Sequence, residues 1–234
     1  NGEGGAEDKH QARSLYKKAC DADHFGGCFN LGLMLDSGEG GTQDKHQART
    51  IYSKACDADH FQGCNNLGLM LNKGEGGDED KHQARTLFKK ACDGDHFQGC
   101  NNLGLMLDNG EGGDEDKHQA RTLYKKACDA DHFIGCNNLG IMLDSGEGGA
   151  EDKHQARTLF KKACDGDYFH GCTNLGIMLN KGEGGTEDKH QARTLFKKAC
   201  DGGYFQGCTN RAFMLNNGLG GTEDKHQART LYKK

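Results

Sequence analysis

Apolar residues recur along the chain at the spacing expected of helices that bury one face. In the first segment the apolar positions follow an i, i+3, i+4, i+7, i+8 pattern, and they are Ala12, Leu15, Tyr16, Ala19 and Cys20. A second stripe follows, made of Cys28, Leu31, Gly32 and Leu35. The two stripes predict a helix–turn–helix unit. Its helices are too short to be stable alone in water, so packing between units must hold them.

The ends of the first helix carry capping signals. Asp8 and Gln11 form a capping box at its start. Lys17 and Lys18 stand near its end, where positive charge complements the helix dipole. These signals predict a first helix that begins just after Asp8 and ends before the turn at residues 21–23.

Turn residues separate the helices. Within the turn, glycine takes a C-cap-like position in three units, at Gly94, Gly166 and Gly202. Asp59 and Gln62 indicate a capping box for the second helix. The Gly-Glu-Gly-Gly run at residues 38–41 is predicted to end the second helix as a plain connecting turn.

The whole unit is repeated without a slip in register. The motif Asp-Lys-His-Gln-Ala-Arg recurs every 36 residues, beginning at Asp8, Asp44, Asp80, Asp116, Asp152, Asp188 and Asp224. Hydrophobic residues make up only 34% of the chain, which suits repeats because each unit buries its apolar face against its neighbours. The sequence predicts an all-α fold, an α/α solenoid. We expect one repeat domain over residues 1–234, with six 36-residue repeats and a half repeat at 218–234.

Charge and hydropathy narrow the classes of partner. The net charge of −5 gives no indication of nucleic-acid binding. No run approaches the roughly 18 consecutive apolar residues of a membrane span, so we expect no membrane insertion. The chain opens with Asn-Gly-Glu-Gly-Gly, without an initiator Met or an apolar leader. We therefore expect a removed signal peptide or an excised segment.

The motif pattern resembles a known family. Ala19-Cys20, then Cys28-x-x-Leu31-Gly32-x-x-Leu35-x-x-Gly38-x-Gly40, then Asp44-x-x-x-Ala48 is similar to the Sel-one-like repeat, a relative of the tetratricopeptide repeat. Lys18-Ala19-Cys20-Asp21 with Gly27-Cys28-x-Asn30-Leu31-Gly32 is similar to the Helicobacter cysteine-rich protein subfamily. The resemblance implies a right-handed superhelix with a concave face lined by first helices. It also implies protein binding, a secreted or periplasmic location, and one disulfide within each repeat.

The chain has 12 cysteines in pairs of fixed spacing: Cys20 and Cys28, Cys56 and Cys64, Cys92 and Cys100, Cys128 and Cys136, Cys164 and Cys172, Cys200 and Cys208. Each pair flanks the turn between antiparallel helices, where the Cα atoms can come within disulfide range. A metal site from Cys20, His24 and Cys28 is an alternative, but Tyr168 and Tyr204 replace that histidine in two units. Buried free thiols are a third possibility. Disulfides are favoured, and we expect no cofactor.

Two enzyme-like motifs have plainer explanations. Residues 14–17, Ser-Leu-Tyr-Lys, match the Ser-x-x-Lys element of penicillin-recognising enzymes, and the subfamily resemblance also implies β-lactam binding or hydrolysis. No Ser-Asp-Asn or Lys-Thr-Gly partner occurs. The glycine run at 38–41 precedes a helix as phosphate loops do, but acidic neighbours would repel phosphate. We expect no enzymatic activity; a β-lactamase-like activity and metal or haem binding remain alternatives.

A polar stripe recurs on the first helices. This first-helix stripe comprises His10, Arg13, Lys17, His46, Arg49, His82, Arg85, Lys89, His118, Arg121, Lys125, His154, Arg157, Lys161, His190, Arg193 and Lys197, with Ser53 in the lysine position of the second repeat. It is either a solvated face or a concave groove for an acidic or extended peptide. Met34 and its copies are expected in the core.

The sixth repeat departs from the others. Arg211 replaces leucine, and Ala212 replaces a glycine that would let helices approach closely. We expect Arg211 to reach solvent or an acidic partner, and the second helix of this repeat to pack differently. The half repeat should cover that face with Ala228, Leu231 and Tyr232, leaving an apolar edge for end-to-end self-association. The near-identity of the repeats indicates a recent tandem duplication or a consensus-type array.

Overall fold

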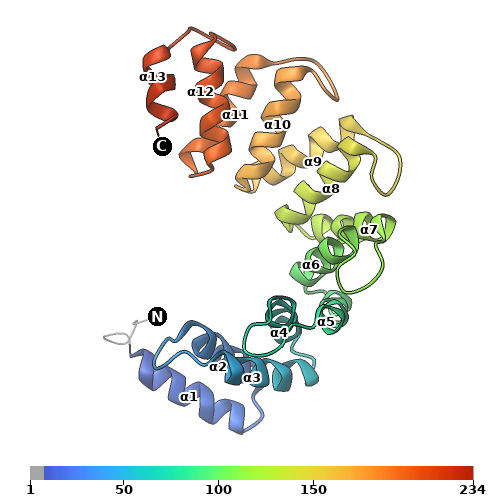
Figure 1. The fold of residues 1–234 in the computed structure, drawn as a ribbon, viewed down its shortest axis with the longest axis vertical. Coiled ribbons are helices and arrows are strands. Elements are labelled where there is room, and N and C mark those ends of the chain that lie inside the picture. The colour runs from blue at the N-terminus through green and yellow to red at the C-terminus, as the bar shows by residue number, and fades with distance from the viewer. Residues whose placement is uncertain (1–7, 234) are drawn as a thin grey trace. The chain divides into compact units, whose positions relative to one another are not determined.

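The computed structural model describes residues 8–233, which form thirteen α-helices and no β-strand (Figure 1). The helices are α1 (Lys9–Asp21), α2 (Phe25–Ser37), α3 (Lys45–Asp57), α4 (Phe61–Lys73), α5 (Lys81–Asp93), α6 (Phe97–Asp108), α7 (Lys117–Asp129), α8 (Phe133–Ser145), α9 (Lys153–Asp165), α10 (Phe169–Lys181), α11 (Lys189–Asp201), α12 (Phe205–Asn216) and α13 (Lys225–Leu231). The predicted all-α fold of helix–turn–helix repeats is confirmed.

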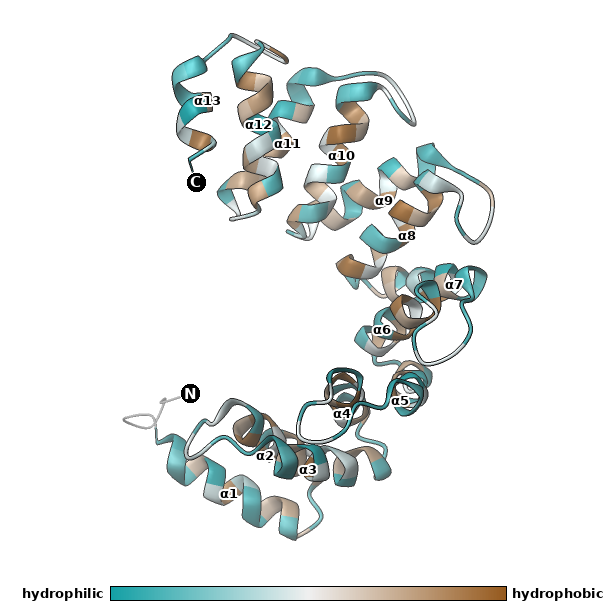
Figure 2. Cartoon of the chain, viewed as in Figure 1, coloured by the Kyte–Doolittle hydropathy of each residue, from teal (hydrophilic) through white to brown (hydrophobic). Residues whose placement is uncertain are grey.

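The chain forms two compact units, residues 1–116 and residues 117–234. Within each unit, a second helix packs against the first helix of its own repeat and that of the next, as α2 does with α1 and α3, and α8 with α7 and α9. Figure 2 shows apolar residues gathered on second helices such as α4, α8 and α10. The units therefore build their cores from neighbouring repeats, as the pattern predicts.

The predicted buried stripe of the first helices is confirmed in the second repeat, where Tyr52 is 1% exposed and Ala48 is fully covered. In the first repeat it is wrong for Leu15 and Tyr16, which are 57% and 36% exposed. The reason is that α3 packs against both α2 and α4, whereas α1 packs against α2. Met34 and its five copies are also buried, at 8% exposure or less, which confirms their place in the core. Burial raises the pKa of Tyr52 to about 12.

The first helices begin as predicted. The Asp44 side chain accepts a hydrogen bond of 2.9 Å from the backbone N–H of Gln47, and the same cap starts α1, α5, α9, α11 and α13. This bond satisfies one of the donors that a helix leaves unpaired at its N-terminus.

Gly94, Gly166 and Gly202 lie at the C-caps of α5, α9 and α11, as predicted. The left-handed residue of the turn is the one after the C-cap: Asp23 has a φ of 59°, and four copies of it share this conformation, whereas Gly94 has a φ of −87°. Aspartate tolerates this region better than most side chains do, and it lets the N–H of His24 reach the carbonyl of Ala19 at 2.9 Å. The second helices therefore start from a residue such as His60, and the capping box predicted at Asp59 is wrong.

The turn glycines also have a packing role. A Cβ at Gly94 would collide with the ring of Phe61 from the preceding repeat, and Gly166 and Gly202 meet Phe133 and Phe169 in the same way. The absence of a side chain thus lets the next first helix approach the start of the preceding second helix.

A second set of glycines receives aromatic rings between repeats. A Cβ at Gly176 would lie 2.6 Å from Cε1 of Phe196, which is closer than real atoms approach. In α12, Ala212 takes the place of this glycine and is fully buried. Tyr232 takes the place of the aromatic ring in the following helix, and it is 54% exposed. α12 nevertheless packs against α11 and α13, as second helices do elsewhere in this unit. Ala228 and Leu231 of α13 complete its core, so the half repeat covers α12 with these two residues as predicted. The prediction is wrong for Tyr232, which is exposed.

Candidate functional site

The cysteines pair within their own repeats. Each disulfide joins the end of a first helix to the start of a second, and the Cα atoms of Cys20 and Cys28 lie 4.4 Å apart. The pairs are Cys20–Cys28, Cys56–Cys64, Cys92–Cys100, Cys128–Cys136, Cys164–Cys172 and Cys200–Cys208. These sulfurs are therefore not available as thiolate ligands. Across residues 8–233, no group of three His, Cys, Asp or Glu side chains could hold a metal.

The histidine and arginine of the first-helix stripe fasten the connecting loop of their own repeat. Nδ1 of His10 donates to the Gly40 carbonyl at 3.2 Å, and Nη1 of Arg13 donates to the Thr42 carbonyl at 2.9 Å. The same bonds are made by His46 and Arg49, His82 and Arg85, His118 and Arg121, His154 and Arg157, and His190 and Arg193. Each arginine uses one of its five N–H donors in this bond.

The lysine of the stripe is exposed and pairs along its own helix. Nζ of Lys17 lies 2.8 Å from Oδ2 of Asp21, and both side chains are more than 60% exposed. The same pair recurs at Lys89, Lys125, Lys161 and Lys197. Such solvated pairs contribute little to stability, so these lysines can exchange one carboxylate for another.

The neighbouring lysine connects successive repeats, a role that the sequence analysis missed. Nζ of Lys54 donates to the carbonyl of Cys20 at 2.8 Å and pairs with Asp23 at 2.9 Å. The hydrogen bond from Lys54 to Asp23 holds the pKa of the Asp23 carboxyl below its usual value. Lys90, Lys162 and Lys198 make the same two contacts. The strict recurrence of the lysine was a visible signal, but it was interpreted only as complementing the helix dipole.

Asparagines link adjacent second helices and were also missed. Nδ2 of Asn102 donates to Oδ1 of Asn65 at 2.9 Å, and Asn174 bonds Asn137 in the same way. Asn65 and Asn137 are buried, at 4% exposure. These bonds satisfy polar groups that would otherwise be costly inside the core.

Aromatic residues lie at the starts of the second helices. The ring of His60 stacks on Phe29, with centroids 5.0 Å apart. Burial lowers the pKa of His60 and His96 below the usual histidine value. In the last two full repeats Tyr168 and Tyr204 occupy this position, and burial raises the pKa of Tyr168.

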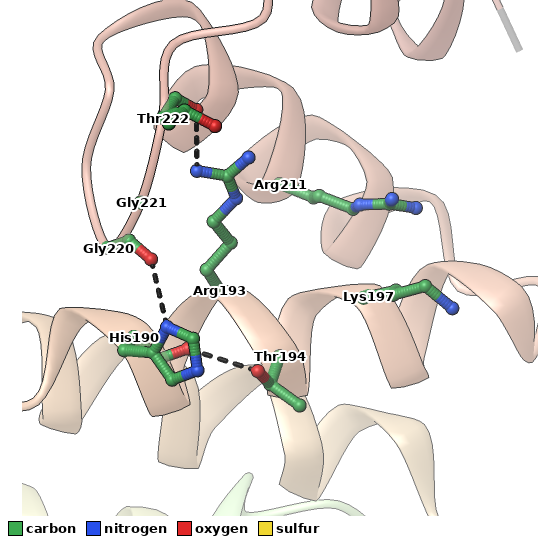
Figure 3. A pocket seen from close by; sticks show the side chains of 8 residues that line it. All are labelled: His190, Arg193, Thr194, Lys197, Arg211, Gly220, Gly221 and Thr222. Carbon is green, nitrogen blue, oxygen red and sulfur yellow. Dashed lines mark hydrogen bonds between the residues drawn. The ribbon is translucent and has the colours of Figure 1, made fainter.

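The first-helix stripe borders pockets beside the connecting loops. In the second repeat, a cavity of about 430 Å³ is lined by His46, Arg49, Thr50, Ser53, Leu67, Leu71, Gly76, Gly77, Asp78 and Gln83. In the sixth, a cavity of about 310 Å³ is lined by His190, Arg193, Thr194, Lys197, Arg211, Gly220, Gly221 and Thr222 (Figure 3). The structure thus brings histidine and arginine of the stripe together with loop backbone at both places.

Arg211 reaches an acidic partner, as expected. Its Nη1 lies 3.9 Å from Oδ1 of Asp201, and its Nη2 donates to Oε1 of Gln227 at 3.2 Å. The contact with Gln227 joins α12 to the half repeat.

The Ser-x-x-Lys element lies on the surface of α1. Ser14 is exposed, and Lys17 is paired with Asp21. The geometry gives Ser14 no activating base, so nothing in it favours a nucleophilic serine.

Comparison with known proteins supports the repeat assignment. The Sel1 repeat model matches seven segments, at residues 1–24, 26–60, 62–96, 98–132, 134–168, 170–204 and 206–234. No curated protein matches the chain at a significant level. Among the described residues, none of the helices is both long and apolar enough to cross a membrane.

Solved structures share the fold. A protective antigen of uropathogenic Escherichia coli with an SLR fold is 28% identical, with a TM-score of 0.89, over 99% of this chain and 50% of the antigen. This chain spans about half the length of that antigen. A Sel1 repeat protein from Oxalobacter formigenes is 18% identical, with a TM-score of 0.84, over 97% of this chain and 96% of its own. Helicobacter pylori cysteine-rich protein B is 31% identical over 57% of this chain and 96% of its own, with a TM-score of 0.47. Because the repeat model matches nearly every residue in a regular series, the chain belongs to the Sel1 repeat family.

Proposed function

We propose that this disulfide-bonded repeat scaffold binds an acidic, extended peptide segment of another protein along its first-helix stripe, and that it has no catalytic activity of its own. The observation that carries the proposal is the recurrence of one arrangement. In every repeat from the first to the sixth, a histidine and an arginine are fixed against the connecting loop, and in two repeats they border a pocket. We infer that the stripe lines the concave face of the solenoid.

The chemistry of the stripe suits carboxylates. An arginine held by one N–H keeps further donors for a charge-assisted hydrogen bond, and guanidinium matches the planar carboxylate. The stripe lysines are already paired with exposed carboxylates, which shows that their geometry is compatible with such a ligand. Equal spacing of the repeats would let successive acidic residues of an extended chain meet successive pockets.

The six disulfides support an oxidising location, and we propose that the protein is secreted or periplasmic. Bridges within each repeat also compensate for the small apolar core of a single repeat.

The test is binding of a fluorescein-labelled octapeptide of alternating Glu and Gly, followed by fluorescence anisotropy. The variant Lys125→Gln/Lys161→Gln should weaken binding about five-fold, because two stripe charges are lost. The control Lys73→Gln/Lys181→Gln removes the same charge from second helices and should leave binding unchanged. Affinity should fall with added salt, because screening weakens the attraction between the stripe and the acidic peptide. Equal affinity of both double variants would contradict the proposal.

We also propose end-to-end self-association through the C-terminal half repeat. Phe205 is 68% exposed and Tyr232 is 54% exposed, while at the other end Leu15 and Tyr16 are exposed. Sedimentation velocity over a concentration series should show reversible association that Tyr232→Ser weakens. A protein that stays monomeric throughout the series would show this part of the proposal to be wrong.

A further inference from the structure

One core position of the second helix changes its chemistry in the sixth repeat. The leucines of the other five repeats, at 5–6% exposure, are Leu31, Leu67, Leu103, Leu139 and Leu175. Arg211 stands in their place, and its side chain is 14% exposed. Since arginine keeps its charge under all ordinary conditions, the guanidinium must find polar partners at the edge of the core.

The guanidinium of Arg211 borders the pocket of the sixth repeat. Figure 3 shows Arg211 and Lys197 pointing in the same direction, while Arg193 extends toward Thr222. Together with His190, these side chains give the pocket three permanent cations and one titratable group. None of its eight lining residues is acidic.

The pocket of the second repeat provides an internal comparison. There, Leu67 takes the place of Arg211, Ser53 takes the place of Lys197, and Asp78 takes the place of Thr222. Only Arg49 remains as a permanent cation, and Asp78 offsets its charge. The sixth-repeat pocket is therefore the more basic of the two at every position where they differ in charge.

The carboxylate that pairs with cations of the sixth-repeat pocket does not neutralise them all. Asp201 pairs with Lys197 at 2.6 Å and lies 3.9 Å from Arg211, so one carboxylate is shared by two cations. Nη1 of Arg193 bonds the neutral carbonyl of Thr222. An excess of positive charge thus surrounds a cavity of about 310 Å³.

We propose that this pocket is a carboxylate-binding site that anchors one acidic group of the bound peptide, with Arg193 and Arg211 as its charged donors. The inference rests on the proposed function, because the pocket is the sixth-repeat part of the first-helix stripe. This pocket binds a carboxylate more tightly than the rest of the stripe does. It therefore sets the register of an extended acidic peptide at the sixth repeat.

The first experiment follows the guanidinium Nε–H signals of Arg193 and Arg211 by NMR in the full chain. The probes are N-acetylglutamate α-amide, which carries a side-chain carboxylate, and N-acetylglycine, which carries a chain-terminal one. Saturable shifts in the millimolar range with either probe support the site, and the tighter probe identifies the source of the carboxylate. N-acetylglutamine α-amide is the neutral control. Absence of saturable shifts with both carboxylates would overturn the inference, and so would equally tight binding of inorganic phosphate.

The second experiment compares Arg211→Leu with Lys181→Gln. The first variant restores the residue of the other five repeats, so it should fold, and it should weaken both the carboxylate probe and the octapeptide about ten-fold or more. The second removes one positive charge from the exposed end of α10, outside the first-helix stripe, and should change affinity less than two-fold. If the octapeptide binds wild type and Arg211→Leu equally, the pocket is not the anchor, although the stripe still binds. If only the small carboxylate binds, the site stands and the peptide-binding function fails.

Discussion

At the scale of single residues, the repeats are fitted together by glycines that face aromatic rings. Gly32 lies against Tyr52, and Gly68 lies against Phe88. The sequence placed these glycines correctly in the buried stripe of the second helix. It could not show which ring each one meets, because that contact joins residues of different repeats.

Adding a methyl group at such a glycine should destabilise the array. A Cβ at Gly32 would collide with the Tyr52 ring, which is fully enclosed and has to move as a rigid body. We expect Gly32→Ala to cost about 1–3 kcal/mol. Gly26 lies in the same helix, and a Cβ there would meet nothing within 4 Å. Gly26→Ala should therefore stabilise the protein by about 0.5–1 kcal/mol. Urea unfolding of both variants measures the difference, and a stabilising Gly32→Ala would refute the packing argument.

At the scale of helices, each full repeat is closed by its own disulfide, and within each unit a lysine attaches a repeat to the preceding one, at Lys54, Lys90, Lys162 and Lys198. The cysteine spacing and the family resemblance were sufficient to predict the first of these. The second was not predictable from helical periodicity, because the acceptor of Lys54 is a backbone carbonyl 34 residues earlier in the chain.

Reduction should loosen the repeats strongly. The loop between paired cysteines is short, and the chain-entropy estimate is about 2.5 kcal/mol per bridge. Thermal unfolding followed by circular dichroism, with and without reductant, should show a large fall in the melting temperature. An unchanged melting temperature would mean that packing alone holds the repeats.

Two adjacent lysines of α5 allow the contribution of the inter-repeat contact to stability to be compared with that of a surface charge. Lys90 bonds the Cys56 carbonyl at 2.7 Å, whereas Lys89 pairs only along its own helix with Asp93 among the contacts described. We expect Lys90→Met to cost about 1–2 kcal/mol and Lys89→Met to cost less than about 0.5 kcal/mol. Chemical denaturation of the two variants is the measurement. Equal losses would show that charge, and not the contact between repeats, is responsible.

At the scale of the whole molecule, the two units differ in their sensitivity to acid. His60 and His96 of the first unit have pKa values lowered by burial, and the equivalent residues in the last two full repeats of the second unit are tyrosines. The unfolded chain therefore binds these protons more tightly than the folded chain does. Their contribution to stability is complete above the usual histidine pKa of 6.5 and is lost as the pH falls through that value and then through the lowered folded values.

Replacing both histidines should remove this sensitivity. In His60→Tyr/His96→Tyr, which copies the residues of the second unit, the melting temperature should fall less between pH 7 and pH 5 than it does in wild type. Differential scanning calorimetry at several pH values provides the comparison. A parallel decline in both proteins would assign the acid sensitivity to other groups.

The fold was predictable because the repeat signals are local and occur many times. Seven copies of one pattern identified the helices, and the caps of the first helices were predicted to the residue. The details of the turn were not, because Asp23 and Gly94 exchange the roles that their residue types suggest. The hydrogen bonds of the first-helix stripe to the loop could not be predicted, because they depend on how Gly40 and its copies fold back. The role of the stripe in binding stays a prediction.

The lysine contact always joins a repeat to the one before it in the chain, so the repeats can assemble in the order in which they are synthesised. Lys54 reaches back to the turn of the first repeat, so within a unit a repeat completes the contacts of the one made before it. Proteins are synthesised from the N-terminus, and early segments can fold while later ones are still emerging. Each pair of cysteines lies only 8 residues apart, so both members emerge together. In an oxidising compartment, disulfide formation can then proceed repeat by repeat as the chain emerges, and within each unit a following first helix contacts a turn that is already closed.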